Sequence, residues 1–233
     1  MDCSSMFEDI CIRYSWCKKI VAYVLMMQGM DESHGLPHTI RVLCNSLYLV
    51  KRLQDVNMDE EVVILASLLH DIGRGFEDYL NLHHAEISAI LAKPILEEVG
   101  ISRDKQKHVI DAILEHSFSI GGKPSSMESC IVSDADKLDA LGAIGVYRLI
   151  ETSAMRSRVV ADTLAHVWEK LVKLPDLMCL DVSRQEAHRR LKVLKEFIDM
   201  LRSEILPYED AIAKSFTIAF DFLEKERKRL THS

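Results

Sequence analysis

The sequence is poor in the two residue types that interrupt helices. It has nine glycines and five prolines among 233 residues, and no segment alternates between apolar and polar residues strongly enough to indicate a strand. Apolar residues instead recur at intervals of three and four, as in Val62, Leu65, Ala66 and Leu69. The sequence therefore predicts an all-α protein, with helices over 5–28, 37–54, 59–71, 82–98, 102–116, 127–141, 142–152, 160–174, 184–206 and 208–231.

Long apolar runs are also absent. The most apolar early run, IVAYVLMM, is too short to span a bilayer. The N-terminus carries Asp2, Glu8 and Asp9 and lacks the basic stretch before an apolar core that marks a secretion signal. We therefore expect a cytoplasmic protein that has no membrane partner.

The cysteines show no CxxC motif and no other paired spacing. They are scattered along the chain, a distribution that favours neither a zinc ribbon nor a disulfide framework. We expect reduced thiols at all six positions, which are Cys3, Cys11, Cys17, Cys44, Cys130 and Cys179.

The sequence has fewer basic residues than acidic ones. The formal net charge is −7 and the isoelectric point is about 5.8, which argues against a broad basic surface for duplex nucleic acid. A local basic pocket for a small phosphate ligand is still compatible with this balance. The sequence also lacks a P-loop and a Gly-rich dinucleotide motif. With 48% hydrophobic and 28% charged residues, the chain is expected to fold as one domain over 1–233.

An imidazole and a carboxylate stand side by side at the end of the apolar helix EEVVILASLL. Asp71 follows His70 directly, and burying its charge there would be costly without a cation or hydrogen-bond donors. Gly73 would then let the backbone turn away. His38 lies near the start of another predicted helix, and Asp136 lies on a third. Two imidazoles with two carboxylates suit Mn²⁺, Fe²⁺, Ni²⁺ or Zn²⁺ better than Ca²⁺ or Mg²⁺, although each histidine taken alone also fits a packed core position.

Three motifs together resemble a known family. The segment LLHDIGR, with His38 in SHGLPHTIRV before it and Asp136 in DADKLDALGAIG after it, is similar to the HD-domain superfamily of metal-dependent phosphohydrolases. HAEISA, HSFS and EKLVKLPDLM further resemble a small single-domain subgroup, so the similarity covers about residues 20–190. The resemblance implies a compact helical bundle with a metal-site core over about 20–150 and a helical C-terminal part over 151–233. It also implies that one divalent ion is held by His38, His70, Asp71 and Asp136.

The predicted ligand set involves a choice between two carboxylates and one departure from the family pattern. Asp134 and Asp136 should not share one role, because residues two apart on a helix face different sides. The resemblance and the following Lys137 favour Asp136 as the ligand. Members of the family often carry an Asp before the first ligand histidine, where this chain has Pro37. We therefore expect that a carboxylate behind the ligands is missing, which would weaken the binding of the metal.

Other residues are candidates for contact with the substrate. The resemblance implies that His84 and His116 bind a second ion, contact phosphate or act as acid or base. Arg74 and Lys137 follow ligands directly and can neutralise phosphate charge, although a surface position is the alternative for both. The candidates for substrate binding are His34 and Arg148; a loop over 148–163, shorter than in the subgroup, adds Arg156 and Arg158 as a possible altered lid.

The resulting expectation is a divalent-metal-dependent phosphohydrolase that acts on a small phosphorylated metabolite, a nucleotide above all. Hydrolysis of a nucleoside triphosphate with release of pyrophosphate is one form of this reaction. The alternatives are a phosphomonoesterase or phosphodiesterase and a nucleotide-sensing module without turnover. Mn²⁺ is the favoured ion among Mn, Fe, Ni, Zn and Mg. Apolar helix faces allow a homodimer, but core packing explains them equally well.

Overall fold

The computed structural model describes residues 2–53, 56–117 and 123–231, and every regular element in these ranges is a helix. This confirms the all-α prediction. The chain divides into two compact units, Met1–Leu194 and Lys195–Ser233. The elements are α1 (Cys3–Arg13), α2 (Cys17–Gln28), α3 (Leu36–Arg52), α4 (Glu60–Leu69), the 3₁₀-helix η1 (Arg74–Phe76), α5 (Glu77–Leu80), α6 (His84–Glu98), α7 (Arg103–Glu115), α8 (Met127–Asp139), α9 (Gly142–Met155), α10 (Val160–Glu169), the 3₁₀-helix η3 (Leu171–Leu177) and α11 (Asp181–Thr231).

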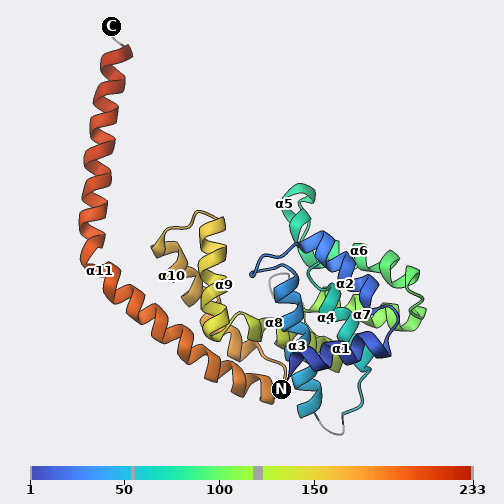
Figure 1. Ribbon diagram of the computed structural model, residues 1–233. Coiled ribbons are helices and arrows are strands. Elements are labelled where there is room, and N and C mark those ends of the chain that lie inside the picture. The colour runs from blue at the N-terminus through green and yellow to red at the C-terminus, as the bar shows by residue number, and fades with distance from the viewer. Residues whose placement is uncertain (1, 54–55, 118–122, 232–233) are drawn as a thin grey trace. The chain divides into compact units, whose positions relative to one another are not determined.

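Helix α4 lies at the centre of the first unit. Its residues from Val62 to Leu69 are all buried, as expected for a helix that is apolar on every side. The Asp59 side chain accepts hydrogen bonds from the backbone N–H groups of Glu61 and Val62 and so begins the helix. Helices α3, α7 and α8 pack around α4, and Figure 1 shows this group in the middle of the unit. The end of α4 is therefore enclosed by other helices.

The predicted single helix over 5–28 is wrong. Helix α1 ends at Arg13 and α2 begins at Cys17, because Tyr14 adopts an extended conformation with φ −116°. Trp16 is buried in the break, and its indole N–H donates to Glu61 over 3.0 Å. Placing this large ring in the core interrupts the helix at a point that no glycine or proline marks.

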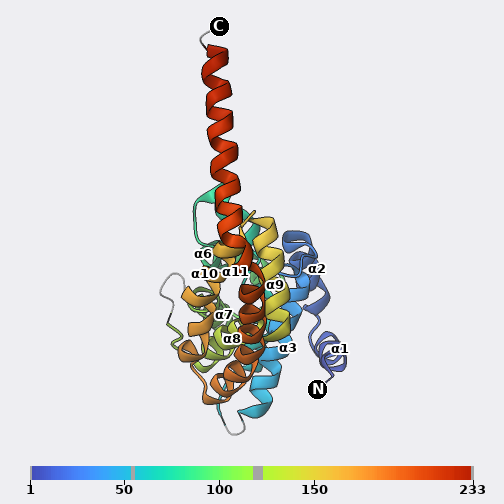
Figure 2. The same ribbon diagram turned by 90° about the vertical axis from the view of Figure 1, so that its left-hand side faces the viewer.

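The predicted break between 206 and 208 is also wrong. Helix α11 runs continuously from Asp181 to Thr231, with Pro207 inside it, and both views show the uninterrupted ribbon (Figures 1 and 2). A proline removes one backbone hydrogen bond but can be accommodated by a bend. The helix predicted over 160–174 ends earlier, since α10 stops at Glu169 and η3 follows. Half of the predicted loop over 119–126, namely 119–122, and residue 54 of the helix predicted over 37–54 lie outside the described residues.

The expectation of six reduced thiols is wrong for four of them. Cys3 is paired with Cys44, at a Cα–Cα distance of 5.8 Å, and Cys11 is paired with Cys17 at 5.0 Å. The first pair joins α1 to α3 across 41 residues of sequence, which spacing alone does not reveal. Cys130 and Cys179 are free. None of the described helices combines the length and the hydropathy that crossing a bilayer requires.

Candidate metal centre and adjoining pocket

The His70–Asp71 doublet lies where α4 ends. Gly73 follows with φ −86°, which any residue can adopt, so the turn itself does not require the glycine as the sequence suggested. The need is for space, because a Cβ atom on Gly73 would lie 2.5 Å from the backbone nitrogen of Ser88 and 2.8 Å from the carbonyl oxygen of His84. Gly73 thus lets α6 approach closely and brings His84 beside the doublet.

The four predicted metal ligands meet inside the first unit. Nε2 of His38, in the first turn of α3, lies 3.3 Å from Nε2 of His70, 3.5 Å from Oδ1 of Asp136 on α8 and 3.8 Å from Oδ2 of Asp71. Both histidines are fully buried and Asp71 is 2% exposed. Donor atoms that bind one ion at about 2.1 Å and at right angles lie about 3 Å apart. The spacing therefore fits a shared cation.

Hydrogen bonds behind the imidazoles fix which nitrogen faces the cluster. Nδ1 of His70 donates to the carbonyl of Ser67 over 2.9 Å, and Nδ1 of His116, in the turn that closes α7, donates to the carbonyl of Ile113 over 2.6 Å. Because these Nδ1 atoms carry the proton, each Nε2 presents a lone pair to the centre. This orientation suits metal binding.

Burial disfavours the protonated form of three imidazoles near the centre. It lowers the pKa of His38 to about 4, because the charged form loses its solvation, and nearby Arg148 adds repulsion. Burial likewise lowers the pKa of His84 to about 4 and that of His116 to about 3. Uncharged imidazoles can bind a metal at neutral pH without first losing a proton.

Both carboxylates remain ionised, although Asp71 is buried and Asp136 is partly buried. Burial by itself raises the pKa of Asp71, but Arg74 and His70 outweigh it and hold this pKa well below its usual range. The pKa of Asp136 is also lowered, because His38 and His70 lie beside it and favour its ionised form. Ionised carboxylates beside neutral imidazoles give the site the negative charge that a divalent cation requires.

Asp71 provides the test of whether a metal fits. Its Oδ2 faces His38, whereas its buried Oδ1 has no hydrogen-bond partner among the described residues. Oδ1 lies 3.4 Å from Nε2 of His84 and 3.8 Å from Nε2 of His116. An unpaired buried carboxylate oxygen is costly, and a cation removes that cost. The ligand set therefore fits one ion beside Asp136, and the chemistry of the His84 and His116 side also suits a second.

The sequence analysis missed Asp139, which acts behind the ligands. Its Oδ2 accepts from Nδ1 of His38 over 2.8 Å, and its carboxylate is also bound by Arg41 and Arg148, at 2.8 and 2.9 Å. The expectation that Pro37 leaves His38 without such a carboxylate is therefore wrong. The signal was the spacing of Asp136 and Asp139, three residues apart and hence on one face of α8.

Glu77 on α5 is a second residue that the sequence analysis missed. It binds both the backbone N–H of His84, over 2.9 Å, and Nδ1 of its ring, over 2.7 Å, which turns Nε2 towards Asp71. Arg74 lies against the same ring and reaches Oδ2 of Asp71, with Nε 3.5 Å away. Two of the candidates for substrate contact, Arg74 and His84, thus lie directly beside the metal cluster.

The remaining candidates on α8 differ in position. Asp134 points away from the ligands and accepts the backbone N–H groups of Cys179 and Leu180, both over 2.9 Å, just before α11. Lys137 is buried and donates to the carbonyl of Ser133 over 3.1 Å, and its side chain lines the adjoining pocket. Asp134 therefore anchors the start of α11, in agreement with its lower rank as a ligand.

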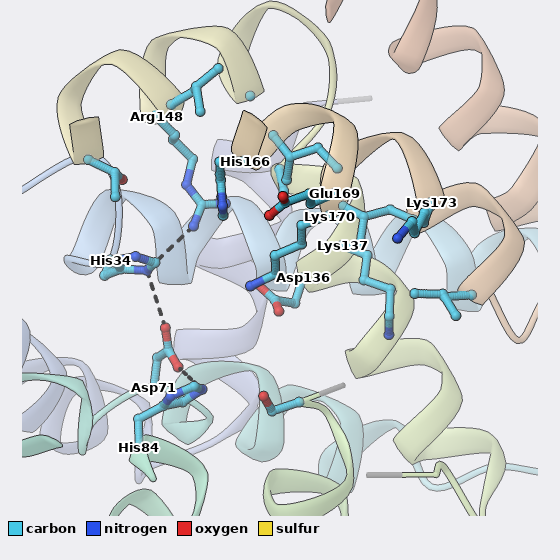
Figure 3. A pocket seen from close by; sticks show the side chains of 18 of the residues that line it. His34, Asp71, His84, Asp136, Lys137, Arg148, His166, Glu169, Lys170 and Lys173 are labelled. Carbon is cyan, nitrogen blue, oxygen red and sulfur yellow. Dashed lines mark hydrogen bonds and ion pairs between the residues drawn. The ribbon is translucent and has the colours of Figure 1, made fainter. Parts of the chain in front are cut away.

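The two predicted substrate-binding residues lie at the pocket wall. Nδ1 of His34 lies 3.6 Å from Oδ2 of Asp71. Arg148 is 8% exposed and donates to the carbonyl of Ser33 and to Asp139 over 2.9 Å each. Most of its donors are thus used within the protein, although one nitrogen reaches His34 at 3.5 Å (Figure 3).

A cavity of about 290 Å³ adjoins the metal cluster. Figure 3 shows Asp71 and His84 on one side of it and side chains of α9, α10 and η3 on the other. Leu149, Leu171, Leu174 and Leu177 supply apolar surface. Cationic side chains beyond Arg74 and Arg148 also line the cavity, and these are Lys137, Arg156, Arg158, Lys170 and Lys173. The sequence analysis missed the last two, which follow α10 and are brought to the site only by the fold.

Comparisons with known proteins agree with this architecture. A model of the HD domain family matches residues 35–141, which include all four predicted ligands. The uncharacterised protein YpgQ of Bacillus subtilis is 30% identical over 186 residues, which cover 75% of this chain and 87% of YpgQ. The crystal structure of YpgQ in complex with ADP has a TM-score of 0.65 at 27% identity and covers 81% of this chain and 97% of its own.

Two further solved structures are similar. A Lactobacillus plantarum protein has a TM-score of 0.70 at 27% identity, covering 83% of this chain and 98% of its own. A predicted HD superfamily hydrolase from an uncultured Thermotogales bacterium has a TM-score of 0.60 at 26% identity, covering 80% and 91%. The extent of the YpgQ match and the HD motif residues gathered in one buried cluster lead to one conclusion: the chain belongs to the HD-domain superfamily, with hydrolases among its relatives.

Proposed function

We propose that the protein is a divalent-metal-dependent phosphohydrolase acting on a nucleotide, and that its favoured reaction is hydrolysis of a nucleoside triphosphate with release of pyrophosphate. One observation carries this proposal. Ionised Asp71 and Asp136 and the imidazoles of His38 and His84 converge at the edge of a cavity whose other walls are apolar and carry more cationic side chains than acidic ones, Glu169 being acidic. Such a site combines groups that bind a cation with groups that bind a phosphorylated ligand.

The metal centre would be held by His38, His70, Asp71 and Asp136, with Mn²⁺ favoured among Mn, Fe, Ni, Zn and Mg. A bound ion of this kind makes hydroxide available near neutral pH and polarises a phosphoryl oxygen. Asp139 keeps the Nε2 lone pair of His38 directed at the centre. His84 and His116 present further nitrogens to the free Oδ1 of Asp71 and would bind a second ion or a phosphate group.

The composition of the pocket supports a nucleotide over a bare phosphate. The volume of about 290 Å³ is at the lower end of small-molecule sites, which run from roughly 300 to 1,000 Å³. Leucines of α9 and η3 offer an apolar surface for a base or sugar. Arg74 and Lys137 would offset phosphate charge close to the ligands, as the sequence predicts, and Arg156, Arg158 and Lys170 would do so farther away. This excess of cations favours a substrate with several phosphates, and the ADP complex of YpgQ supports a nucleotide.

The test is product analysis with a panel of substrates. The protein loaded with Mn²⁺ is incubated with nucleoside tri-, di- and monophosphates, cyclic nucleotides and sugar phosphates, beside an Asp71→Ala control. We expect pyrophosphate and a nucleoside monophosphate from triphosphates, with no product from the control. Inorganic phosphate as the product would favour a phosphomonoesterase, and cleavage of cyclic nucleotides would favour a phosphodiesterase.

The second candidate is a nucleotide-sensing module without turnover. It is favoured by the extensive pairing of Arg148, which leaves that residue little capacity to follow a reacting phosphate. Saturable binding of a nucleotide to the metal-loaded protein, with no product from any member of the panel, would support the sensor and overturn the hydrolase.

A further inference from the structure

The second unit, Lys195–Ser233, contains the greater part of α11 and has large apolar side chains on its surface. Tyr208, Ile212, Phe216 and Leu223 are between 56% and 72% exposed. A single helix has no core of its own in which to bury them. Exposed apolar residues in such number on one element mark a contact surface.

Part of this apolar surface forms one stripe. At about 100° per residue on an α-helix, six side chains fall within a sector of roughly 80°. They are Leu201, Ile205, Tyr208, Ile212, Phe216 and Leu223. Pro207, Lys214 and Asp221 lie on the opposite side. The stripe is thus wide and continuous enough to pack against another helix.

Charge is distributed unevenly along the same helix. Residues 196–210 contain five acidic side chains and one basic one, whereas residues 214–229 contain five basic side chains and three acidic ones. Two copies lying parallel would place like-charged ends together. Two copies lying antiparallel would place the acidic part of each against the basic part of the other, which is the favourable arrangement.

The stripe has a symmetry that suits the antiparallel arrangement. Tyr208 and Leu223 lie eight residues before and seven residues after Phe216, and Ile212 and Ala219 lie four before and three after it. We propose that Lys195–Thr231 pairs antiparallel with the same segment of a second copy of this chain. The paired helices bring the two Phe216 side chains together at the middle, and Tyr208 packs on Leu223 of the partner subunit.

This segment lies outside residues 35–141, which match the HD domain family. The three solved relatives are covered over 91% to 98% of their own length, yet they leave 17% to 20% of this chain unmatched. The second unit accounts for 39 residues of the 233, about the same share. A contact surface there is independent of the metal site and of the proposed reaction.

The test is the molar mass of the full chain by sedimentation equilibrium. We expect a dimer for the natural chain and a monomer for Phe216→Glu. Ile218→Glu is the matched control, because Ile218 is 71% exposed and Phe216 is 72% exposed, yet Ile218 lies on the other side of the helix. We expect this control to stay dimeric. Far-UV circular dichroism verifies that both variants keep their helices.

Cross-linking tests the orientation in a Cys179→Ser background. Phe216→Cys should form a disulfide between copies, whereas Ile205→Cys should not, because antiparallel helices place the two Ile205 positions about 30 Å apart. Disulfides at both positions would mean parallel helices and overturn the proposal. So would a monomeric natural chain, a dimer that withstands Phe216→Glu, or a monomer that sediments with vesicles of anionic phospholipid.

Discussion

At the scale of single residues, Asp139 governs what His38 can bind. Burial raises the pKa of Asp139, but His38 and Arg148 outweigh this and lower it to about 2. The carboxylate is therefore ionised throughout the neutral range and accepts the Nδ1 proton of His38. Nε2 is left as an acceptor that faces Asp136. Arg41 and Arg148 hold the carboxylate in place.

Replacing two carboxylates of α8, one at a time, separates the effect on metal binding from the effect on folding. We expect Asp139→Asn to weaken Mn²⁺ binding about 10- to 100-fold, the usual effect of changing a group behind a metal-ligating histidine. Asp134→Asn should leave Mn²⁺ affinity unchanged and lower the free energy of unfolding by about 1–3 kcal/mol, since one of its two backbone hydrogen bonds is lost. Calorimetric titration and urea unfolding measure the two effects. Equal metal affinity in both variants would contradict the role of Asp139.

The sequence predicted residues of the centre only where a motif marked them. His38, His70, Asp71 and Asp136 stand in a recognisable order, and the fold brings all four together. Asp139 carried only a spacing signal, three residues after Asp136, and Glu77 carried none, because their importance arises from contacts with His38 and His84 that exist only in three dimensions.

At the scale of elements, the close approach of α6 to the end of α4 depends on the absence of one side chain. We expect Gly73→Ala to cost about 1–3 kcal/mol of unfolding free energy, because the added Cβ would lie 2.5 Å from the Ser88 backbone nitrogen. Gly75→Ala is the control, since its nearest neighbour would be 3.9 Å away. Its effect should stay within about 0.5 kcal/mol. Thermal unfolding compares the two, and equal stability would mean that α6 can shift freely.

The segment between α9 and α10 provides a test of the proposed substrate. Arg156 and Arg158 line the pocket, and within the described part of the chain a buried nitrogen of Arg158 has no hydrogen-bond partner. We expect the double change of both residues to Ala to raise KM for a nucleoside triphosphate about tenfold or more, since each charged hydrogen bond is worth about 1.5–3 kcal/mol. KM for a monophosphate should change less. Arg103→Ala, outside the pocket, is the control, and equal activity of the double variant would exclude both residues as phosphate contacts.

Helix boundaries were predictable where a cap or a stop residue marks them. Asp59 begins α4, and Gly100, with φ +78°, follows α6. The break at Tyr14 was not predictable, because it results from burying Trp16 against Glu61. At Pro207 the sequence predicted a break that the structure does not have, since one proline can bend a helix without ending it.

At the scale of the whole molecule, the metal centre should contribute to stability. Without a cation, the first unit keeps ionised carboxylates buried at its centre, so a bound ion stabilises the folded state. We expect Mn²⁺ at one hundred times its dissociation constant to add about 2.7 kcal/mol to the unfolding free energy, and a chelator to reverse the gain. Scanning calorimetry measures it. In Asp71→Ala the shift should vanish, and a shift that persists there would place the stabilising ion elsewhere.

The all-α architecture followed from the sequence because helical periodicity is a local signal. The pairing of Cys3 with Cys44 did not, since it depends on α1 lying against α3. The division at Leu194 was equally invisible, because α11 passes through it without a change in helical pattern. The cytoplasmic location and the single domain over 1–233 stay predictions.

Asp134 and Asp136 lie two residues apart on α8 and point to different sides of it. One carboxylate is bound to the amides of Cys179 and Leu180, and the other faces the imidazoles. Those two amide protons can exchange with solvent only when their hydrogen bonds to Asp134 break. Deuterium uptake at these two amides therefore reports on the metal centre without any substrate. A metal ion bound at Asp136 would slow hydrogen exchange at Cys179, 43 residues farther along the chain.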